Sequence, residues 1–250
     1  MPVIMDEILR RTRERVAALP AVPDSDRQPV SLTRAIRECR DRNPVIAEIK
    51  FASPSRGPIH PPGDPATIAR EYLAGGAVAI SVLTEPFFFG GSPEKLAAVR
   101  RAVSVPILRK DFIIDHRQLP ETKALGADAV LLIAAVLGPD LARFVDDARE
   151  LGLEPLVEVH TREEADLAQA AGADLIGINN RDLRTMSVDL TTTRRLAGHI
   201  GPGRTIVSES GIRWPFDVRT LRDYCDGFLI GSALMADADR KKKLEGFVYA

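Results

Sequence analysis

Short apolar stretches recur along the whole chain, and each is nearly continuous rather than alternating between apolar and polar residues. They are rich in valine, isoleucine and leucine, a pattern typical of parallel strands that are covered on both faces. We therefore predict eight strands, which span residues 45–50, 78–84, 105–110, 128–134, 154–159, 174–179, 205–210 and 227–231.

Segments with a helical pattern separate these strands. Two of them open on a capping residue followed by proline, Asp64-Pro65 and Ser92-Pro93, as helices commonly do. Three end on a similar phrase, AGGA, LGAD or AGAD, whose glycine ends a helix before the next strand. The predicted helices span residues 64–77, 92–103, 115–127, 138–152, 161–173, 189–200, 215–224 and 237–247.

Eight strands that alternate with eight helices predict an α/β fold of the (β/α)8 TIM barrel type. We expect a single domain over residues 1–250, in which residues 1–43 form an N-terminal helical extension with helices in 6–19 and 31–41. We expect the extension to pack on the barrel, across one of its mouths. A doubly wound open sheet is the alternative, but no GxGxxG motif follows a strand.

Composition limits the partners and the location. Charged residues make up 28% of the chain and the formal net charge is −1, so no overall positive field would attract nucleic acid or an anionic membrane. No apolar run reaches the length of a membrane helix, and the N-terminal stretch resembles neither a signal nor a transit peptide. Cys39 and Cys225 match no zinc or CxxC spacing. We expect a cytoplasmic protein with reduced cysteines, a monomer or weak homodimer, although a disulfide stays open.

Charged residues gather at the carboxyl ends of the predicted strands, where barrel enzymes place their chemistry. Glu48 and Lys50 lie two residues apart in one strand and so face the same side. Lys110 and Glu158 lie at the ends of two other strands. Any one of these charges could be a solvated residue or half of an ion pair. Burying all four would cost several kcal/mol per charge unless they are paired, so we predict that they share a polar pocket.

The last two strands lead into turns of small residues, SESGI (208–212) and LIGSAL (229–234). Loops at these places in a barrel commonly bind phosphate, although two ordinary glycine turns would look the same. The long loop after the first strand carries Ser53, Ser55 and Arg56 and could form a lid over a phosphate.

Aromatic residues follow the second strand in the run PFFFGGS (86–92). Consecutive phenylalanines are usually core, but here they could wall an aromatic substrate together with Phe112. The four histidines show no metal-binding spacing and are interpreted as surface or structural residues, so we expect no metal ion. We find no P-loop and no Ser-His-Asp order.

The strand ends carry a series of motifs that resembles the indole-3-glycerol-phosphate synthase family of tryptophan biosynthesis. The motifs are EIKxxSPSxG, SVLTE…FFGGS, ILRKDFIID…Q, GADAVLLI, PLVEVH, IGINNRDL and SESGI…GFLIGSALM. They occur in order at every predicted strand, over about residues 44–235. A single fragment such as SESGI would be weak evidence, whereas the full series is highly specific.

The resemblance implies an enzyme that closes 1-(2-carboxyphenylamino)-1-deoxyribulose 5-phosphate to an indole, with loss of CO₂ and water and without metal or organic cofactor. The position of the family's general acid corresponds to Lys110, and the positions of its catalytic carboxylates correspond to Glu158 and Glu48. Lys50 would hold the substrate carboxylate or assist dehydration. The other catalytic matches are Asn179 and Ser210, and the substrate-binding matches are Ser53, Phe89, Phe112, Leu131, Arg181, Gly211, Gly231 and Ser232. Which carboxylate acts at which step stays open.

The chain also departs from the family pattern. Phe51 and Ala52 follow Lys50, where the family usually has a further basic residue, and Arg56 replaces a common lysine. The C-terminal RKKKLEGFVYA is interpreted as the end of the last helix with a solvated run of charges.

Two alternative functions stay open. A barrel similar to phosphoribosylanthranilate isomerase would have a cysteine at the end of the first strand, where this chain has Glu48 and Lys50. A ligand-binding barrel without catalysis would not need both lysines and both glutamates.

Overall fold

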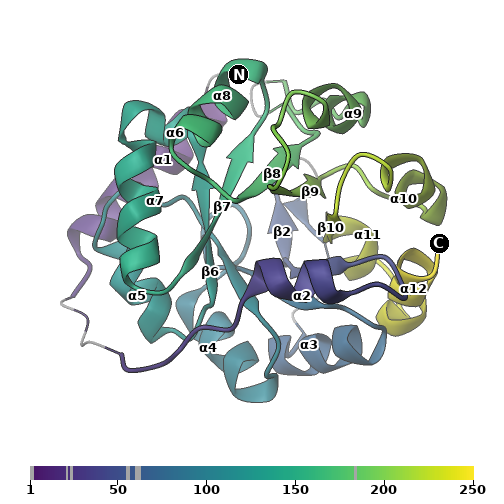
Figure 1. Ribbon diagram of the computed structural model, residues 1–250. Coiled ribbons are helices and arrows are strands. Elements are labelled where there is room, and N and C mark those ends of the chain that lie inside the picture. The colour runs from purple at the N-terminus through teal and green to yellow at the C-terminus, as the bar shows by residue number, and fades with distance from the viewer. Residues whose placement is uncertain (1–2, 21, 23–24, 55–56, 60–62, 183–184) are drawn as a thin grey trace.

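Parallel strands close into a barrel in the computed structural model, which describes residues 3–20, 22, 25–54, 57–59, 63–182 and 185–250 (Figure 1). The hydrogen-bonded order is β1-β10-β9-β8-β7-β6-β5-β4, and β4 pairs with β1 to close the ring. The barrel strands are β1 Val45–Ile49, β4 Ala79–Leu83, β5 Ile107–Lys110, β6 Ala129–Ile133, β7 Glu154–Val159, β8 Leu175–Asn179, β9 Thr205–Glu209 and β10 Gly227–Ile230. The TIM barrel is therefore confirmed, and the open sheet is wrong because this sheet has no free edge strand among the described residues.

The helices between the strands form the outer layer of the barrel (Figure 1). They are α3 Pro65–Ala74, α4 Pro93–Ala102, α5 Gln118–Ala124, α7 Leu141–Glu150, α8 Arg162–Ala170, α9 Thr191–Ala197, α10 Pro215–Leu221 and α12 Arg240–Val248. Each lies on a predicted helix. The side chain of Asp64 accepts the N–H groups of Ala66 and Thr67, and that of Ser92 accepts the N–H of Lys95, so both predicted caps form.

Five short elements were not expected from the sequence. They are α6 Ala134–Leu137, which the 3₁₀ turn η1 Gly138–Asp140 extends, α11 Ser232–Met235, and the hairpin of β2 Ala52–Ser53 with β3 Gly57–Pro58. Apolar periodicity shows itself over windows of about 11 residues. Elements of this length therefore carry no pattern that the sequence could reveal.

The N-terminal extension meets both ends of the barrel rather than one mouth alone. Helix α2, Leu32–Glu38, crosses the near end of the barrel in Figure 1, whereas α1, Val3–Ala17, lies on the far side. Just before α2, the backbone N–H of Val30 bonds to Asp128, the residue before β6, at 2.7 Å. From α1, Arg15 donates to Asp111, the residue after β5, at 2.8 Å. Helix α2 thus closes the amino end of the barrel, and α1 covers part of the carboxyl end.

Alternate strand residues fill the interior of the barrel. This buried cluster includes Ile46, Leu108, Leu156, Leu175, Val207 and Leu229, with Ile8 of α1 and Leu32 and Ile36 of α2. Side chains two positions apart lie on the same face of a strand. The residues two positions later on these strands therefore face the same interior, one layer nearer to its carboxyl end.

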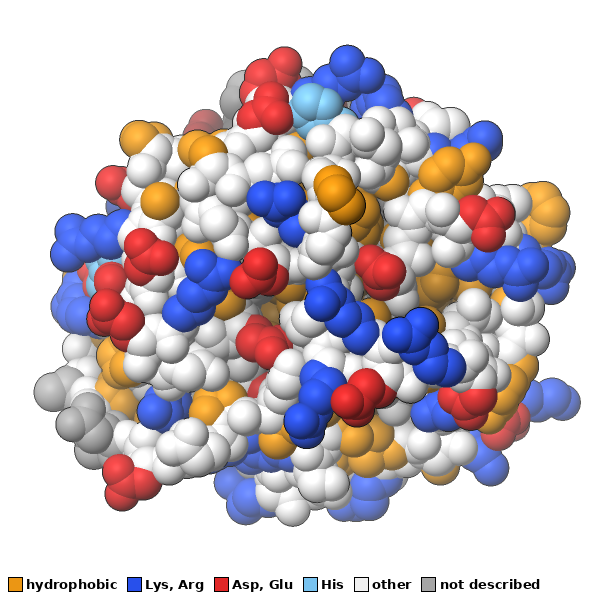
Figure 2. All heavy atoms as spheres, in the orientation of Figure 1, with side chains coloured by type: hydrophobic (Ala, Val, Ile, Leu, Met, Phe, Trp, Pro, Cys, Tyr) orange, Lys and Arg blue, Asp and Glu red, His pale blue; other side chains and the backbone are white. Residues whose placement is uncertain are grey.

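The surface and the cysteines add little to the functional picture. On the face that α2 covers, basic and acidic side chains are interspersed (Figure 2). Cys39 and Cys225 are both free thiols. No helix within the described ranges is long and apolar enough to cross a membrane.

Candidate active site

A cavity of about 370 Å³ opens at the carboxyl end of the barrel. Every residue that the sequence predicts for the site lines this cavity: Glu48, Lys50, Ser53, Phe89, Lys110, Phe112, Leu131, Glu158, Asn179, Arg181, Ser210, Gly211, Gly231 and Ser232. Ser55 and Arg56, the other residues of the predicted lid, lie outside the described residues. The structure thus brings together residues from all eight barrel strands or from the loops that follow them.

The pair at the end of β1 faces into the cavity. Lys50 Nζ lies 2.5 Å from Glu48 Oε1, and the side chains are 14% and 3% exposed. Gly231, the residue after the neighbouring strand β10, faces this carboxylate, and a Cβ at 231 would overlap Glu48 Oε1. Glycine is needed there to leave room for Glu48, in addition to any role in binding phosphate.

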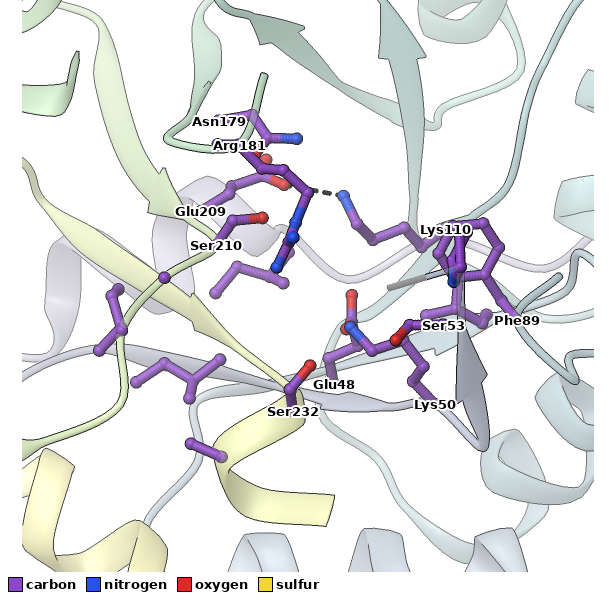
Figure 3. A pocket seen from close by; sticks show the side chains of 18 of the residues that line it. Glu48, Lys50, Ser53, Phe89, Lys110, Asn179, Arg181, Glu209, Ser210 and Ser232 are labelled. Atoms are coloured by element: carbon purple, nitrogen blue, oxygen red, sulfur yellow. Dashed lines mark hydrogen bonds and ion pairs between the residues drawn. The ribbon is translucent and has the colours of Figure 1, made fainter. Parts of the chain in front are cut away.

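Lys110, at the end of β5, extends across the cavity toward Glu209 (Figure 3). Its Nζ lies 2.7 Å from Glu209 Oε2 and 3.2 Å from Glu158 Oε2. Burial disfavours the ammonium, but the surrounding carboxylates outweigh burial and raise the pKa of Lys110. Lys110 is therefore held as a cation that can donate hydrogen bonds.

Glu209 is a site residue that the sequence analysis missed. It is 1% exposed, and no described residue donates a hydrogen bond to its Oε1. Burial, together with repulsion from Glu158, outweighs the attraction of Lys110 and raises the pKa of Glu209 to about 7. Strand alternation could have revealed Glu209. Val207, two residues earlier, faces the barrel interior, so Glu209 must face it too.

Gly177 of β8 makes room for Glu209 in the same way as Gly231 does for Glu48. A Cβ at 177 would overlap Glu209 Oε1. The φ angle of Gly177 is not in the left-handed region, so backbone conformation does not demand glycine at this position. Glycine is required at position 177 because the carboxylate of Glu209 packs against it.

Asn179 and Arg181 continue from the end of β8. The side chain of Asn179 lies beside Glu158 and helps to lower the pKa of that carboxylate, and its Oδ1 accepts the backbone N–H of Arg181 at 3.0 Å. Arg181 also donates to the carbonyl of Met186 at 3.2 Å. Asn179 therefore orients one of the central carboxylates, while Arg181 brings a cation to the cavity wall.

Small residues after β9 and β10 form another part of the wall. Ser210 and Gly211 both adopt left-handed backbone conformations, with φ of 65° and 84°. Ser232 is the first residue of α11 and points into the cavity (Figure 3). These turns lie where a phosphate would bind in such a barrel.

Apolar residues line the opposite wall. The rings of Phe89 and Phe112 lie 6.2 Å apart, centre to centre. Glu85 accepts the backbone N–H groups of residues 87, 88 and 89 and so fixes the loop that carries Phe89. Three residues of α1 that were not predicted, Ile4, Met5 and Ile8, also line the cavity. Phe51, which departs from the family pattern, lies under Lys95, whose Nζ is 4.6 Å from its ring centre.

The interpretation of the C-terminal charges as wholly solvated is wrong for two residues. Lys243 lines the cavity, with its Nζ 4.6 Å from the centre of the Trp214 ring. Arg240 is 12% exposed and pairs with Glu71 at 3.2 Å. Helix α12 turns one face toward the barrel, so charges on that face are not free in solvent.

The three described histidines lie at the surface or pair with carboxylates. His116 and His199 each pair with an aspartate near the surface, and His60 lies outside the described residues. His160, however, is 12% exposed and its Nε2 lies 3.5 Å from Glu158 Oε1. In the described part of the chain, no group of histidine, cysteine and acidic residues could hold a metal ion.

Comparison with known proteins decides the family. The family model for indole-3-glycerol phosphate synthase matches residues 5–247. The chain belongs to this family. It is 50% identical to indole-3-glycerol phosphate synthase 2 of Streptomyces coelicolor over 206 residues, 82% of this chain and 80% of that protein. It is 45% identical to the Geobacillus thermodenitrificans synthase over 242 residues, 94% of this chain and 93% of that protein.

Two solved structures support the fold alone. A thiamine phosphate pyrophosphorylase from Pyrococcus furiosus has a TM-score of 0.62 at 20% identity and covers 87% of this chain and 96% of its own. A tryptophan synthase from M. tuberculosis has a TM-score of 0.64 at 13% identity and covers 87% of this chain and 98% of its own.

Proposed function

We propose that this protein is an indole-3-glycerol phosphate synthase. It would convert 1-(2-carboxyphenylamino)-1-deoxyribulose 5-phosphate to indole-3-glycerol phosphate, CO₂ and water. One observation carries the proposal: Lys110 extends into the cavity between Glu158 and Glu209, at 3.2 and 2.7 Å. The family match across nearly the whole chain supports the same reaction.

Ring closure joins the aromatic carbon that bears the carboxylate to the keto carbon of the sugar, and the keto oxygen takes up a proton. Lys110 is the donor to this oxygen, because its carboxylate neighbours keep it as an ammonium. A preorganised cation in a buried site stabilises the developing alkoxide without reorganising at the moment of reaction. Loss of CO₂ then restores the aromatic ring.

The ammonium of Lys50 faces the substrate carboxylate in this proposal. Lys50 also lines the cavity and is held by Glu48 at 2.5 Å. The apolar wall of Phe89, Phe112 and Leu131 receives the aromatic ring. Arg181 and the turns at Gly211, Gly231 and Ser232 receive the phosphate, with Ser53 from the first loop.

Dehydration needs a base for a carbon-bound proton and an acid for the departing hydroxyl group. Burial opposes the charge on Glu158, but Lys110 outweighs it and lowers the pKa of Glu158 overall, so Glu158 suits the base. Glu209, whose pKa is raised to about 7, suits the acid. Glu48 assists this step, and Asn179 and Ser210 complete the polar wall.

The remaining expectations stay predictions. They are a single domain over residues 1–250 with 1–43 as its extension, a cytoplasmic location, a monomer or weak homodimer, no nucleic acid or membrane partner, and turnover without metal or cofactor. The isomerase alternative is disfavoured because Cys39 is the C-cap of α2, at the amino end of the barrel, far from the cavity.

The decisive experiment mixes the purified protein with the ribulose phosphate substrate and follows indole fluorescence and CO₂ release. We expect both signals to rise in parallel, and to do so in the presence of a chelator. Isomerisation without CO₂ would support the isomerase alternative. Saturable binding without turnover would support a ligand-binding barrel.

A further inference from the structure

His160 stands between two carboxylates just beyond the end of β7. Its Nδ1 lies 3.1 Å from Glu164 Oε2, which the first turn of α8 supplies. Its Nε2 lies 3.5 Å from Glu158 Oε1, within ion-pair distance but outside hydrogen-bond geometry. Glu209 of β9 also acts on the ring through space. The acidic surroundings favour a positively charged ring.

Glu158 and Glu209 share Lys110 but differ in their other partners. Glu158 also has His160 and the amide of Asn179. The Oε1 of Glu209 packs against Gly177 and receives no hydrogen bond from a described residue. Two buried carboxylates beside one ammonium repel each other, so one of them gains a proton more readily. The carboxylate with a second cation beside it is the one that stays ionised.

We infer that His160, as an imidazolium, selects which glutamate keeps the proton: Glu158 stays a carboxylate and Glu209 stays the acid. The inference rests on the proposed function and adds to it which of the two glutamates, Glu158 or Glu209, acts as base and which as acid. His160 acts through Glu158 and is therefore a positioning residue rather than a catalytic one. No oxidation or group transfer by His160 is involved.

The pKa values agree with this geometry. Burial opposes a charge on His160, but the carboxylates around it, Glu164 first, raise its pKa overall. Burial also raises the pKa of Glu158, yet Lys110 and then His160 lower it overall. Among the described residues, Lys110 is the cation within ion-pair distance of Glu209, and burial raises the pKa of Glu209 to about 7.

An NMR titration of the histidine rings tests the charge on His160 without any turnover. His199 is the matched control, because it is 33% exposed and faces a single carboxylate, Asp166. We expect the ring of His160 to keep its proton to a higher pH than a histidine in an unstructured peptide does. Glu164→Gln should lower the midpoint of His160 by about one pH unit, since a counter-charge is lost. A wild-type midpoint for His160 below that of the peptide histidine would overturn the inference.

The pH profile of kcat tests the effect on Glu158. In His160→Gln, Glu158 loses a cation and its pKa rises, so the acidic limb should move to higher pH by about one unit. His160→Asn should give the same shift, because its amide can still bond Glu164 but carries no charge. His199→Gln should leave the limb in place. A uniform loss of kcat with an unmoved limb in both variants would mean that His160 is only structural.

Infrared titration separates this inference from the proposed function. The infrared spectrum of the Glu209→Gln variant contains the carboxyl band of Glu158. Subtracting the spectrum of the Glu158→Gln/Glu209→Gln double variant isolates that band. When His160→Gln is added to both variants, the band of protonated Glu158 should appear at a higher pH than it does with His160 present. If the protein turned over no substrate, the proposed function would fail while this band still decided the role of His160. An unchanged band would contradict it.

Discussion

Two buried carboxylates, Asp128 at the amino end of the barrel and Glu209 at the carboxyl end, have their hydrogen-bonding needs met to different degrees. At the amino end, Asp128 accepts hydrogen bonds from the guanidinium groups of Arg27 and Arg100 and from the backbone N–H groups of Val30 and Ile107. Both of its oxygens are in use. At the carboxyl end, Glu209 has one oxygen on Lys110 and the other without a hydrogen bond from any described residue.

The difference separates a structural carboxylate from a chemical one. A buried carboxylate with every lone pair engaged costs little to keep and much to remove, so it fastens chain segments together. Asp128 fastens the segment before α2 to the barrel in this way. A buried carboxylate with an unused oxygen keeps a raised pKa and can take or give a proton near neutral pH. Burial and charge alone would not distinguish Asp128 from Glu209, whereas their hydrogen-bond partners do.

Removing Lys110 should have the largest effect on turnover. Lys110→Met should lower kcat by on the order of 100-fold or more, because the donor to the keto oxygen is lost. Lys242→Met, at an exposed position on α12, is the control. Circular dichroism should show both variants folded. Near-normal turnover in Lys110→Met would remove Lys110 from the role of acid.

Removing a carboxylate at the amino end should affect stability instead. Asp128→Asn should lower the free energy of unfolding by about 2 kcal/mol, because buried donors lose a charged acceptor. Asp174→Asn breaks an ion pair whose carboxylate side chain is 76% exposed, and it should cost less than about 1 kcal/mol. Urea unfolding measures both. A fall in kcat with an unchanged free energy of unfolding in Asp128→Asn would contradict the structural role of Asp128.

The sequence predicted the barrel well because its signals are local and repeated. Each barrel strand is an apolar run, and Asp64 and Ser92 mark helix starts that the structure reproduces. The paths of α1 and α2 to opposite ends could not be predicted, because they depend on long-range contacts. Arg15 meets Asp111 across 96 residues of sequence, and no local pattern records that pairing.

The site was predicted in part, because its residues carry motifs and share one end of the strands. Glu209 was missed although it follows the same alternation as Glu158, since only Ser210 and Gly211 were carried over from its strand end. Lys243 was missed because a run of basic residues does not show which member faces inward. The need for glycine at 177 was also hidden, because it arises from a side chain on the neighbouring strand.

Crowding Glu209 should sharpen the comparison with a smaller effect. Gly177→Ala places a Cβ where Glu209 Oε1 lies, so the carboxylate must move relative to Lys110. We expect kcat to fall about tenfold. Gly198→Ala is the control, because a Cβ there meets nothing within 4 Å. Adding Glu209→Asp, which shortens the side chain, should relieve the overlap. An unchanged kcat in Gly177→Ala would show that the position of Glu209 is not critical.

The smallest expected effect is the coupling within the pair at the end of β1. Glu48 and Lys50 are in contact at 2.5 Å, so their substitutions should not be additive. Glu48→Gln should lower kcat through the dehydration step. Lys50→Met should also raise KM, because its ammonium would face the substrate carboxylate. A double-mutant cycle on kcat/KM should give a coupling energy of about 1 kcal/mol.

The same double-mutant cycle shows whether Glu48 and Lys50 are structural, like Asp128, or chemical, like Glu209. If Glu48 and Lys50 behave like Asp128, their loss should appear in urea unfolding and leave kcat unchanged. If they belong with Glu209, the coupling should appear in kcat/KM and exceed any coupling in stability. Strict additivity together with an unchanged kcat in Glu48→Gln would therefore assign the pair to the structure of the barrel. The contact with Gly231, which leaves room for the Glu48 carboxylate at the cavity wall, argues for the second outcome.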